Sequence, residues 1–153
     1  MSVLTIVMYH YVRPLARTRY PKIKALDLTL FDEQLDYLQR NYQPVAMEDV
    51  IGALDGKHDL PRRAVLLTFD DGYLDHYTYV FPRLAARGLQ GAFFAPSQVI
   101  LDRRLLDVNR IHYILASGVD PVELVATIES EILAHGKEWL PKDLSAYRKE
   151  FYR

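Results

Sequence analysis

Two adjacent aspartates are the residues of this chain best suited to catalysis. Asp70 and Asp71 follow an apolar run over residues 65–69 and precede Gly72. Two carboxylates this close repel each other unless a cation or a shared proton compensates, so the pair favours a metal-centred role. A simple turn would use the same three residues, because Asp and Gly are common turn formers. The types of these residues leave both interpretations open.

The run before the two acids has the pattern of a buried strand. Its apolar residues are continuous rather than alternating, as in strands that are covered on both faces of a parallel sheet. Folds of this α/β class place their chemistry at the carboxyl ends of their strands. The expected strand therefore carries Asp70 and Asp71 to the rim of the sheet where an active site is expected.

Other elements of an α/β fold surround this strand. Residues 3–8 and 91–95 are further short apolar runs, and apolar residues at helical spacing lie between the three runs. Thr29, followed by Asp32, is the expected cap of the first helix, and Pro82 is expected to break the helix over 74–87 about one residue earlier. This order of elements predicts a parallel sheet with right-handed crossovers.

The strand signals vanish after residue 106, and three helices are predicted in the rest of the chain. The first carries an apolar face made of Val108, Ile111, His112 and Leu115. The second begins with Asp120 as cap and Pro121 in its first turn, and ends at Gly136. The third spans 142–153. We expect a sheet-containing domain over 1–106 and a helical segment over 107–153.

Three motifs end the expected strands, and their order is informative. They are Met8-Tyr9-His10-Tyr11-Val12, Leu67-Thr68-Phe69-Asp70-Asp71-Gly72-Tyr73 and Gly91-Ala92-Phe93-Phe94. Together they resemble the first strand ends of a polysaccharide deacetylase of the NodB-homology type, carbohydrate esterase family four. The resemblance implies an α/β fold that is the N-terminal part of a distorted, TIM-like (β/α) barrel. Its first three or four parallel strands would be followed by a helical insertion over 107–153.

The resemblance also implies a reaction. It is the metal-dependent hydrolysis that removes N-acetyl groups from an amino-sugar polysaccharide or its precursor. Asp70 would be the catalytic base and Asp71 a ligand of a divalent metal, expected to be zinc. The residue types fit this chemistry, because a metal lowers the pKa of bound water and a neighbouring carboxylate can take the proton. A phosphoryl-transfer enzyme is a weaker alternative, since adjacent acids followed by Gly72-Tyr73 do not match its usual aspartyl motif.

The chain departs from the family in its histidines. The family completes its metal site with two histidines usually about four residues apart, and no two histidines of this chain have that spacing. They are His10, His58, His76, His112 and His135. With no cysteine in the chain, only Asp, Glu or His could complete the site. We therefore expect this chain to hold half of an active site, with a catalytically inactive fragment or interaction module of the same fold as the alternative.

Four other residues are weaker candidates. His10 ends the first expected strand on the same rim as Asp70, so it could line the pocket. His76 could reach the rim from the next helix, or could lie in a solvated first turn. His112 is expected in the core or in an interface. Ser97 lacks the glycine-flanked elbow of a nucleophilic serine.

Composition excludes several other classes of protein. The 153 residues carry a net charge of -1, without the basic excess of a nucleic-acid-binding protein. No run approaches the ~20 apolar residues of a membrane span. The apolar start lacks the features of a signal peptide, so a cytoplasmic location is expected. Three or four strands cannot close a barrel of about seven or eight, so exposed surfaces should favour self-association.

Overall fold

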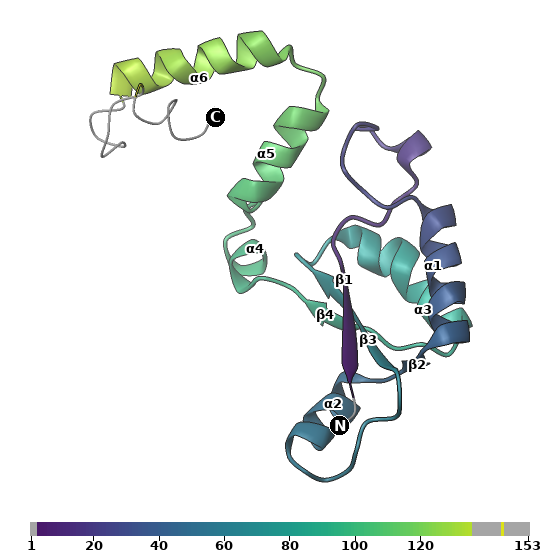
Figure 1. The fold of residues 1–153 in the computed structure, drawn as a ribbon. Helices are drawn as coiled ribbons and strands as arrows, with labels where there is room; N and C mark the ends of the chain where they lie inside the picture. Colours follow the sequence, from purple (N-terminus) through teal and green to yellow (C-terminus); the bar gives the residue numbers. More distant parts are fainter. Residues whose placement is uncertain (1–2, 136–144, 146–153) are drawn as a thin grey trace. The chain divides into compact units, whose positions relative to one another are not determined.

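The computed structural model of the chain describes residues 3–135 and 145. The chain divides into two compact units after Ala116. The first unit contains a four-stranded parallel sheet and its helices, and the second contains α6 (Pro121–His135) (Figure 1). The parallel α/β architecture predicted from the sequence is confirmed. The interpretation of 107–153 as an insertion stays a prediction.

The elements of the first unit follow the predicted order. The strands are β1 (Leu4–Tyr9), β2 (Gln43–Pro44), β3 (Ala64–Asp70) and β4 (Ala92–Phe94). The helices are α1 (Leu28–Asn41), α2 (Met47–Leu54), α3 (Phe81–Ala86), α4 (Ser97–Leu101) and α5 (Asp107–Ala116). A 3-10 turn (Leu15–Arg17) precedes α1, and a π-helical turn (His76–Val80) precedes α3.

β3 is the central strand of the sheet. β1 pairs with it along nearly its whole length, from Leu4 opposite Ala64 to Tyr9 opposite Phe69. β2 pairs with the amino end of β3 and β4 with its carboxyl end, where Asp70 lies opposite Phe94. Because β1 occupies one edge of β3, β2 and β4 must share the other. The carboxyl ends of β1, β3 and β4 therefore meet at Asp70.

Both faces of β3 are buried, which explains its continuous apolar pattern. Val65, Leu67 and Phe69 pack with α1 and α3 in the main core, which lies on one face of the sheet (Figure 1). On the opposite face, Ala64 and Leu66 pack against α2. Phe69 is fully buried, with its ring stacked on those of Tyr9 at 5.2 Å and Phe93 at 4.9 Å between centroids. This packing holds the end of β3 in place immediately before the two acids.

The cap of α1 differs from the prediction. The N-cap is Asp27, whose Oδ1 accepts a hydrogen bond from the backbone N–H of Thr29 at 3.1 Å, while its Oδ2 accepts one from Leu15 at 3.1 Å. The expectation that Thr29 caps the helix with Asp32 is wrong, because the helix has already begun at Leu28. Asp32 instead forms ion pairs with Arg83 in α3 and with Arg87 at the C-cap of that helix.

The helix broken by Pro82 is confirmed. The π-helical turn ends at Val80, and the backbone N–H of Phe81 bonds to the carbonyl of His76, five residues earlier. Proline cannot donate the next helical hydrogen bond and clashes with the preceding turn, so the wider turn accommodates it. This register places His76 on the buried side of the helix.

Two expectations for the helical segment have different outcomes. In α5 the predicted apolar face is wrong: Val108, Ile111 and Leu115 are exposed, whereas Asn109 and Ala116 are buried. The cap of α6 is confirmed, since Asp120 accepts hydrogen bonds from the backbone of residues 122 and 123. The predicted helix end at Gly136 and the helix over 142–153 lie outside the described residues. Among the described helices, none is long and apolar enough to cross a membrane.

Candidate active site

The two acids share one hollow because of an unusual turn. In a strand, neighbouring side chains point to opposite faces, but β3 ends at Asp70, and Asp71 and Gly72 adopt positive φ angles of 73° and 65°. A Cβ atom at Gly72 would lie 2.8 Å from that of Ala95, so glycine is needed here for space as well as conformation. After this turn, Asp70 and Asp71 both line the same hollow.

The hollow lies between the ends of β3 and β4. Its lining residues are Thr68, Asp70, Asp71, Phe94, Ala95 and Pro96. Both carboxylate residues are half-buried, so they remain accessible to a ligand. Phe94 and Pro96 provide an apolar wall beside them. The arrangement places two acids and an apolar surface together at the rim that the sequence predicts for the chemistry.

Asp71 is held from behind by polar side chains. The hydroxyl of Tyr73 donates to Asp71 Oδ2 at 2.9 Å, and Nδ2 of Asn109 lies 3.4 Å from the same oxygen. Burial raises the pKa of the Tyr73 hydroxyl above its ordinary value, helped by hydrogen bonds to Tyr11 and Asp71. Tyr73 therefore keeps its proton and acts as a donor.

Asn109 also contacts Asp71, although no motif in the sequence marks it. It is 2% exposed on α5 and is 38 positions away from Asp71. A usable signal was its helical spacing with Tyr113 and Ala116, which places three residues other than the predicted apolar set on one face. That face packs against the segment after β1, where Tyr11 and Ile23 are buried.

His76 lies behind the acid pair rather than in the hollow. It is 4% exposed, and its Nε2 lies 2.7 Å from the carbonyl oxygen of His10, so Nε2 carries the proton and donates. Burial lowers the pKa of His76. Within the described residues its Nδ1 has no hydrogen-bond partner. The alternative of a solvated first turn is therefore wrong, because the ring packs against Phe69 and Phe93.

The other sequence candidates lie around this centre. His10 contributes its backbone carbonyl to the bond with His76, and its exposed side chain is not among those lining the hollow. Ser97 begins α4 and is exposed. His112 is exposed and therefore not in the core, with Nδ1 at 3.3 Å from the Tyr11 hydroxyl, and its expected place in an interface stays a prediction. The pocket roles of His10 and His76 stay predictions.

The residues present fit one part of a metal site. Asp71 offers carboxylate Oδ1, which accepts no hydrogen bond from the part of the chain that the structure describes, and carboxylate oxygens suit divalent cations. However, residues 3–135 and 145 contain no group of three or more His, Cys, Asp and Glu side chains able to hold a metal. The described site can therefore supply a ligand and a base, but not a complete coordination shell.

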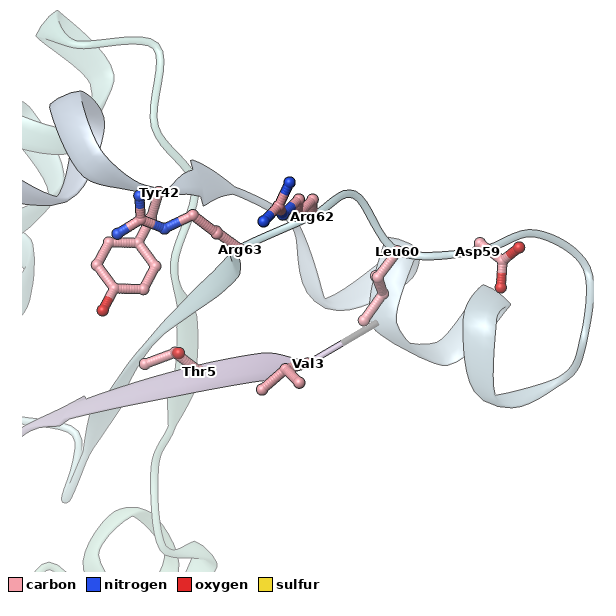
Figure 2. Close-up of a pocket in the computed structure, with 7 residues that line it drawn as sticks. All are labelled: Val3, Thr5, Tyr42, Asp59, Leu60, Arg62 and Arg63. Atoms are coloured by element: carbon pink, nitrogen blue, oxygen red, sulfur yellow. The ribbon is translucent and has the colours of Figure 1, made fainter. Parts of the chain in front are cut away.

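A second pocket lies at the other end of the sheet. Figure 2 shows its lining residues, which are Val3, Thr5, Tyr42, Asp59, Leu60, Arg62 and Arg63. The guanidinium of Arg63 lies 5.3 Å from the centre of the Tyr42 ring. Because Val3 precedes β1 and Arg63 precedes β3, this pocket is at the amino ends of the strands. The length of β3 separates it from the acid pair.

Sequence comparisons connect this chain to known deacetylases. The family profile of polysaccharide deacetylases matches residues 57–136, more than half of the chain. Over 55 residues the chain is 51% identical to the poly-beta-1,6-N-acetyl-D-glucosamine N-deacetylase of Escherichia coli, a match covering 35% of this chain and 8% of that protein. Over 133 residues it is 26% identical to YxkH of Bacillus subtilis, described as a candidate polysaccharide deacetylase, covering 86% and 43% of the two proteins.

Solved structures show the same relationship. The de-N-acetylase from Aggregatibacter actinomycetemcomitans superimposes with a TM-score of 0.55 at 32% identity, over 66% of this chain and 40% of that one. The deacetylase PplD of Streptococcus pyogenes gives a TM-score of 0.54 at 22% identity, over 72% and 51%, and supports the fold alone. The chain thus spans no more than about half the length of these relatives. By the family profile and the shared fold, this chain belongs to the polysaccharide deacetylase family of the NodB-homology type.

Proposed function

We propose that this chain contributes half of the active site of a metal-dependent hydrolase that removes N-acetyl groups from an amino-sugar polysaccharide or its precursor. The observation that carries the proposal is the shared hollow of Asp70 and Asp71 at the carboxyl end of the central strand. Membership in a family of carbohydrate N-deacetylases supports it.

The two acids have different roles in this proposal. Asp70 takes the proton from the attacking water, because a half-buried carboxylate at the rim can reach a bound water. Asp71 serves as one ligand of a divalent cation through the oxygen that Tyr73 leaves unused. When bound, a divalent cation lowers the pKa of water and polarises the acetyl carbonyl.

The substrate to test first is a β-1,6-linked N-acetylglucosamine polymer. The Escherichia coli relative, 51% identical over 55 residues, is named for its action on that polysaccharide. The apolar wall formed by Phe94 and Pro96 beside the acids offers a surface for one face of a sugar ring. A soluble or lipid-linked precursor with the same N-acetyl group would present the same reacting bond.

The second candidate is a catalytically inactive interaction module of the same fold. The observation that favours it is the ligand set, since the chain has no closely spaced histidine pair. In the described part of the chain, no three potential metal ligands come together. A single carboxylate ligand leaves most of a coordination shell to water, so weak metal binding is expected of this chain.

Acetate release from an N-acetylated glucosamine oligosaccharide tests the proposal. The assay uses added zinc or cobalt, with this chain and with the product of the complete gene. We expect activity in the complete product, and we expect Asp70→Asn to reduce it by about 10²–10⁴-fold, the usual contribution of a general base. Asp59→Asn is the matched control, because Asp59 lines the pocket at the opposite end of the sheet.

The outcomes separate the candidates. Activity of this chain alone would show that its site is complete, against the half-site proposal. An inactive complete product would favour the interaction module. Activity unchanged by Asp70→Asn would remove Asp70 from the role of base.

A further inference from the structure

A buried asparagine lies behind the proposed metal ligand. Asn109 is 2% exposed on α5, although the same helix offers apolar side chains that remain in solvent, such as Ile111 at 54% and Leu115 at 62%. Burial of an amide is unfavourable unless its polar atoms find partners. The helix therefore packs on a polar side chain where an apolar one was available, which calls for a role beyond packing.

The partners of Asn109 form a connected network. Its Nδ2 donates to the Tyr73 hydroxyl and lies 3.3 Å from the Tyr11 hydroxyl and 3.4 Å from Asp71 Oδ2. An amide nitrogen has two hydrogens, and one can go to each phenol. The Tyr73 hydroxyl then donates to Asp71 at 2.9 Å, and the Tyr11 hydroxyl is 3.3 Å from Nδ1 of His112. In this arrangement every hydroxyl hydrogen is used once.

The network determines which Asp71 oxygen remains available. Tyr73 and Asn109 both approach Oδ2, and the described residues place no donor on Oδ1. A neighbouring donor holds a carboxylate in one orientation. Groups hydrogen-bonded to metal ligands generally act in this way. The positive φ angle of Asp71 is a backbone conformation that this residue does not favour on its own, so contacts around it must stabilise the turn.

We propose that Asn109 is a positioning residue that acts through Tyr73 to hold the Asp71 carboxylate, so that Oδ1 is the oxygen that binds a cation. The proposal deepens the deacetylase assignment and rests on it for the identity of the ligand. It also assigns α5 to the working site, although the helix follows the last strand of the sheet.

The orientation of the Asp71 side chain gives a test that needs no metal. Three-bond NMR couplings from the side-chain carboxyl carbon to the backbone report whether one χ1 rotamer is populated. We expect one rotamer in the unmodified chain, and averaging among rotamers in Asn109→Leu and Tyr73→Phe. Tyr20→Phe is the matched control, since Tyr20 belongs to the same aromatic cluster and contacts Tyr113 rather than Asp71. A single rotamer in Asn109→Leu would overturn the positioning role of Asn109, whatever the result in Tyr73→Phe.

Cation binding provides the second readout. Calorimetric titration with zinc chloride should show affinity weakened by roughly tenfold in Asn109→Leu and Tyr73→Phe, the scale of outer-partner effects on metal sites. It should be unchanged in Tyr20→Phe. If Asn109→Leu fails to fold by circular dichroism, Asn109→Ala takes its place, because it also removes the amide that donates to Tyr73 while adding no bulk.

Failure of this proposal can be distinguished from failure of the deacetylase assignment. Zinc binding that Asp71→Asn leaves unchanged, or that is absent altogether, would contradict the role of Asp71 as a ligand, while the NMR couplings would still decide whether Asn109 positions its side chain. Zinc binding lost in Asp71→Asn but unaffected by both Asn109→Leu and Tyr73→Phe would overturn the positioning role and leave the ligand role standing.

Discussion

At the scale of single residues, the site depends on a backbone conformation that few residues adopt. Asp71 and Gly72 have positive φ angles in succession, and the next side chain, Tyr73, turns back to bond Asp71. Asp tolerates this region better than most residues, and Gly has no Cβ to oppose it. Local strain of this kind is common where side chains must be aimed at a ligand. The turn and the functional site, which were alternatives in the sequence, involve the same residues in the proposed function.

The buried histidine behind the acids predicts a dependence of stability on pH. Burial lowers the pKa of His76 below its ordinary value of 6.5. As the pH falls through 6.5, the unfolded chain takes up a proton before the folded chain does, so the free energy of unfolding decreases. Urea denaturation at pH 7.5 and at pH 5 should show a loss of stability that is smaller in His76→Gln.

The control for this prediction is His58→Gln, which changes an exposed histidine. It should keep the full pH dependence of the unmodified chain. An equal loss of stability in His76→Gln and in the unmodified chain would mean that other groups cause the effect.

At the scale of elements, the local sequence pattern alone does not identify the residue that caps α1 or the face of α5 that is buried. The α1 cap is one residue before the helix at Asp27, which also ties the 3-10 turn to the helix through Leu15. In α5 the apolar stripe is exposed and the buried face contains Asn109, because the surface it meets contains the hydroxyls of Tyr11 and Tyr73. The chemistry of the partner surface decides which face of a helix is buried.

Removal of the α1 cap should destabilise the chain. Asp27→Ala loses the acceptor for the backbone N–H groups of Thr29 and Leu15, so we expect the midpoint of thermal unfolding to fall by a few degrees. The backbone hydrogen bonds also lower the pKa of Asp27. Its contribution is therefore present above the ordinary pKa of 3.8 and is lost as the pH falls through the lower folded value.

Thr29→Ala is the matched comparison for this prediction. This variant keeps the backbone N–H that donates to Asp27, so it should change the midpoint of thermal unfolding much less than Asp27→Ala does. Circular dichroism at pH 7 measures both variants. A larger effect of Thr29→Ala than of Asp27→Ala would restore the threonine as the cap.

At the scale of the whole molecule, the described residues of the first unit leave one face of the sheet uncovered near the acids. Ile6 and Met8 of β1 are 58% and 60% exposed, and Phe94 of β4 is 50% exposed. Register places Ile6 opposite Leu66 and Met8 opposite Thr68, on the face away from α1 and α3. Among the described residues, no strand pairs with the free edge of β1. Open apolar surface and a free strand edge both favour association.

The open face predicts concentration-dependent self-association of this chain. Sedimentation velocity should show a monomer at low concentration and larger species as the concentration rises. Met8→Lys should shift the distribution toward monomer, because it places a charge on the open face. Leu54→Lys is the control, since Leu54 is 83% exposed at the end of α2. Equal effects of the two substitutions would show that added charge, rather than the open face, controls association.

The sequence alone determined the features that depend on neighbours along the chain. Three of these features are the continuous burial over 65–69, the order of the strands along the chain and the helix break before Pro82. They were predictable because the spacing of apolar residues and the geometry of proline act on neighbouring residues. The position of Asp70 and Asp71 at a strand end and the absence of a closely spaced histidine pair could also be read directly.

Only the tertiary structure decided how the acid pair is supported, because that support comes from residues far apart in the sequence. The burial of His76 depends on the carbonyl of His10, 66 positions earlier, and the support of Asp71 depends on Asn109, 38 positions later. No local pattern contains these pairings, since only packing on β3 brings the segments together. The acid pair was visible in the sequence, whereas the side chains that aim it became visible only in the fold.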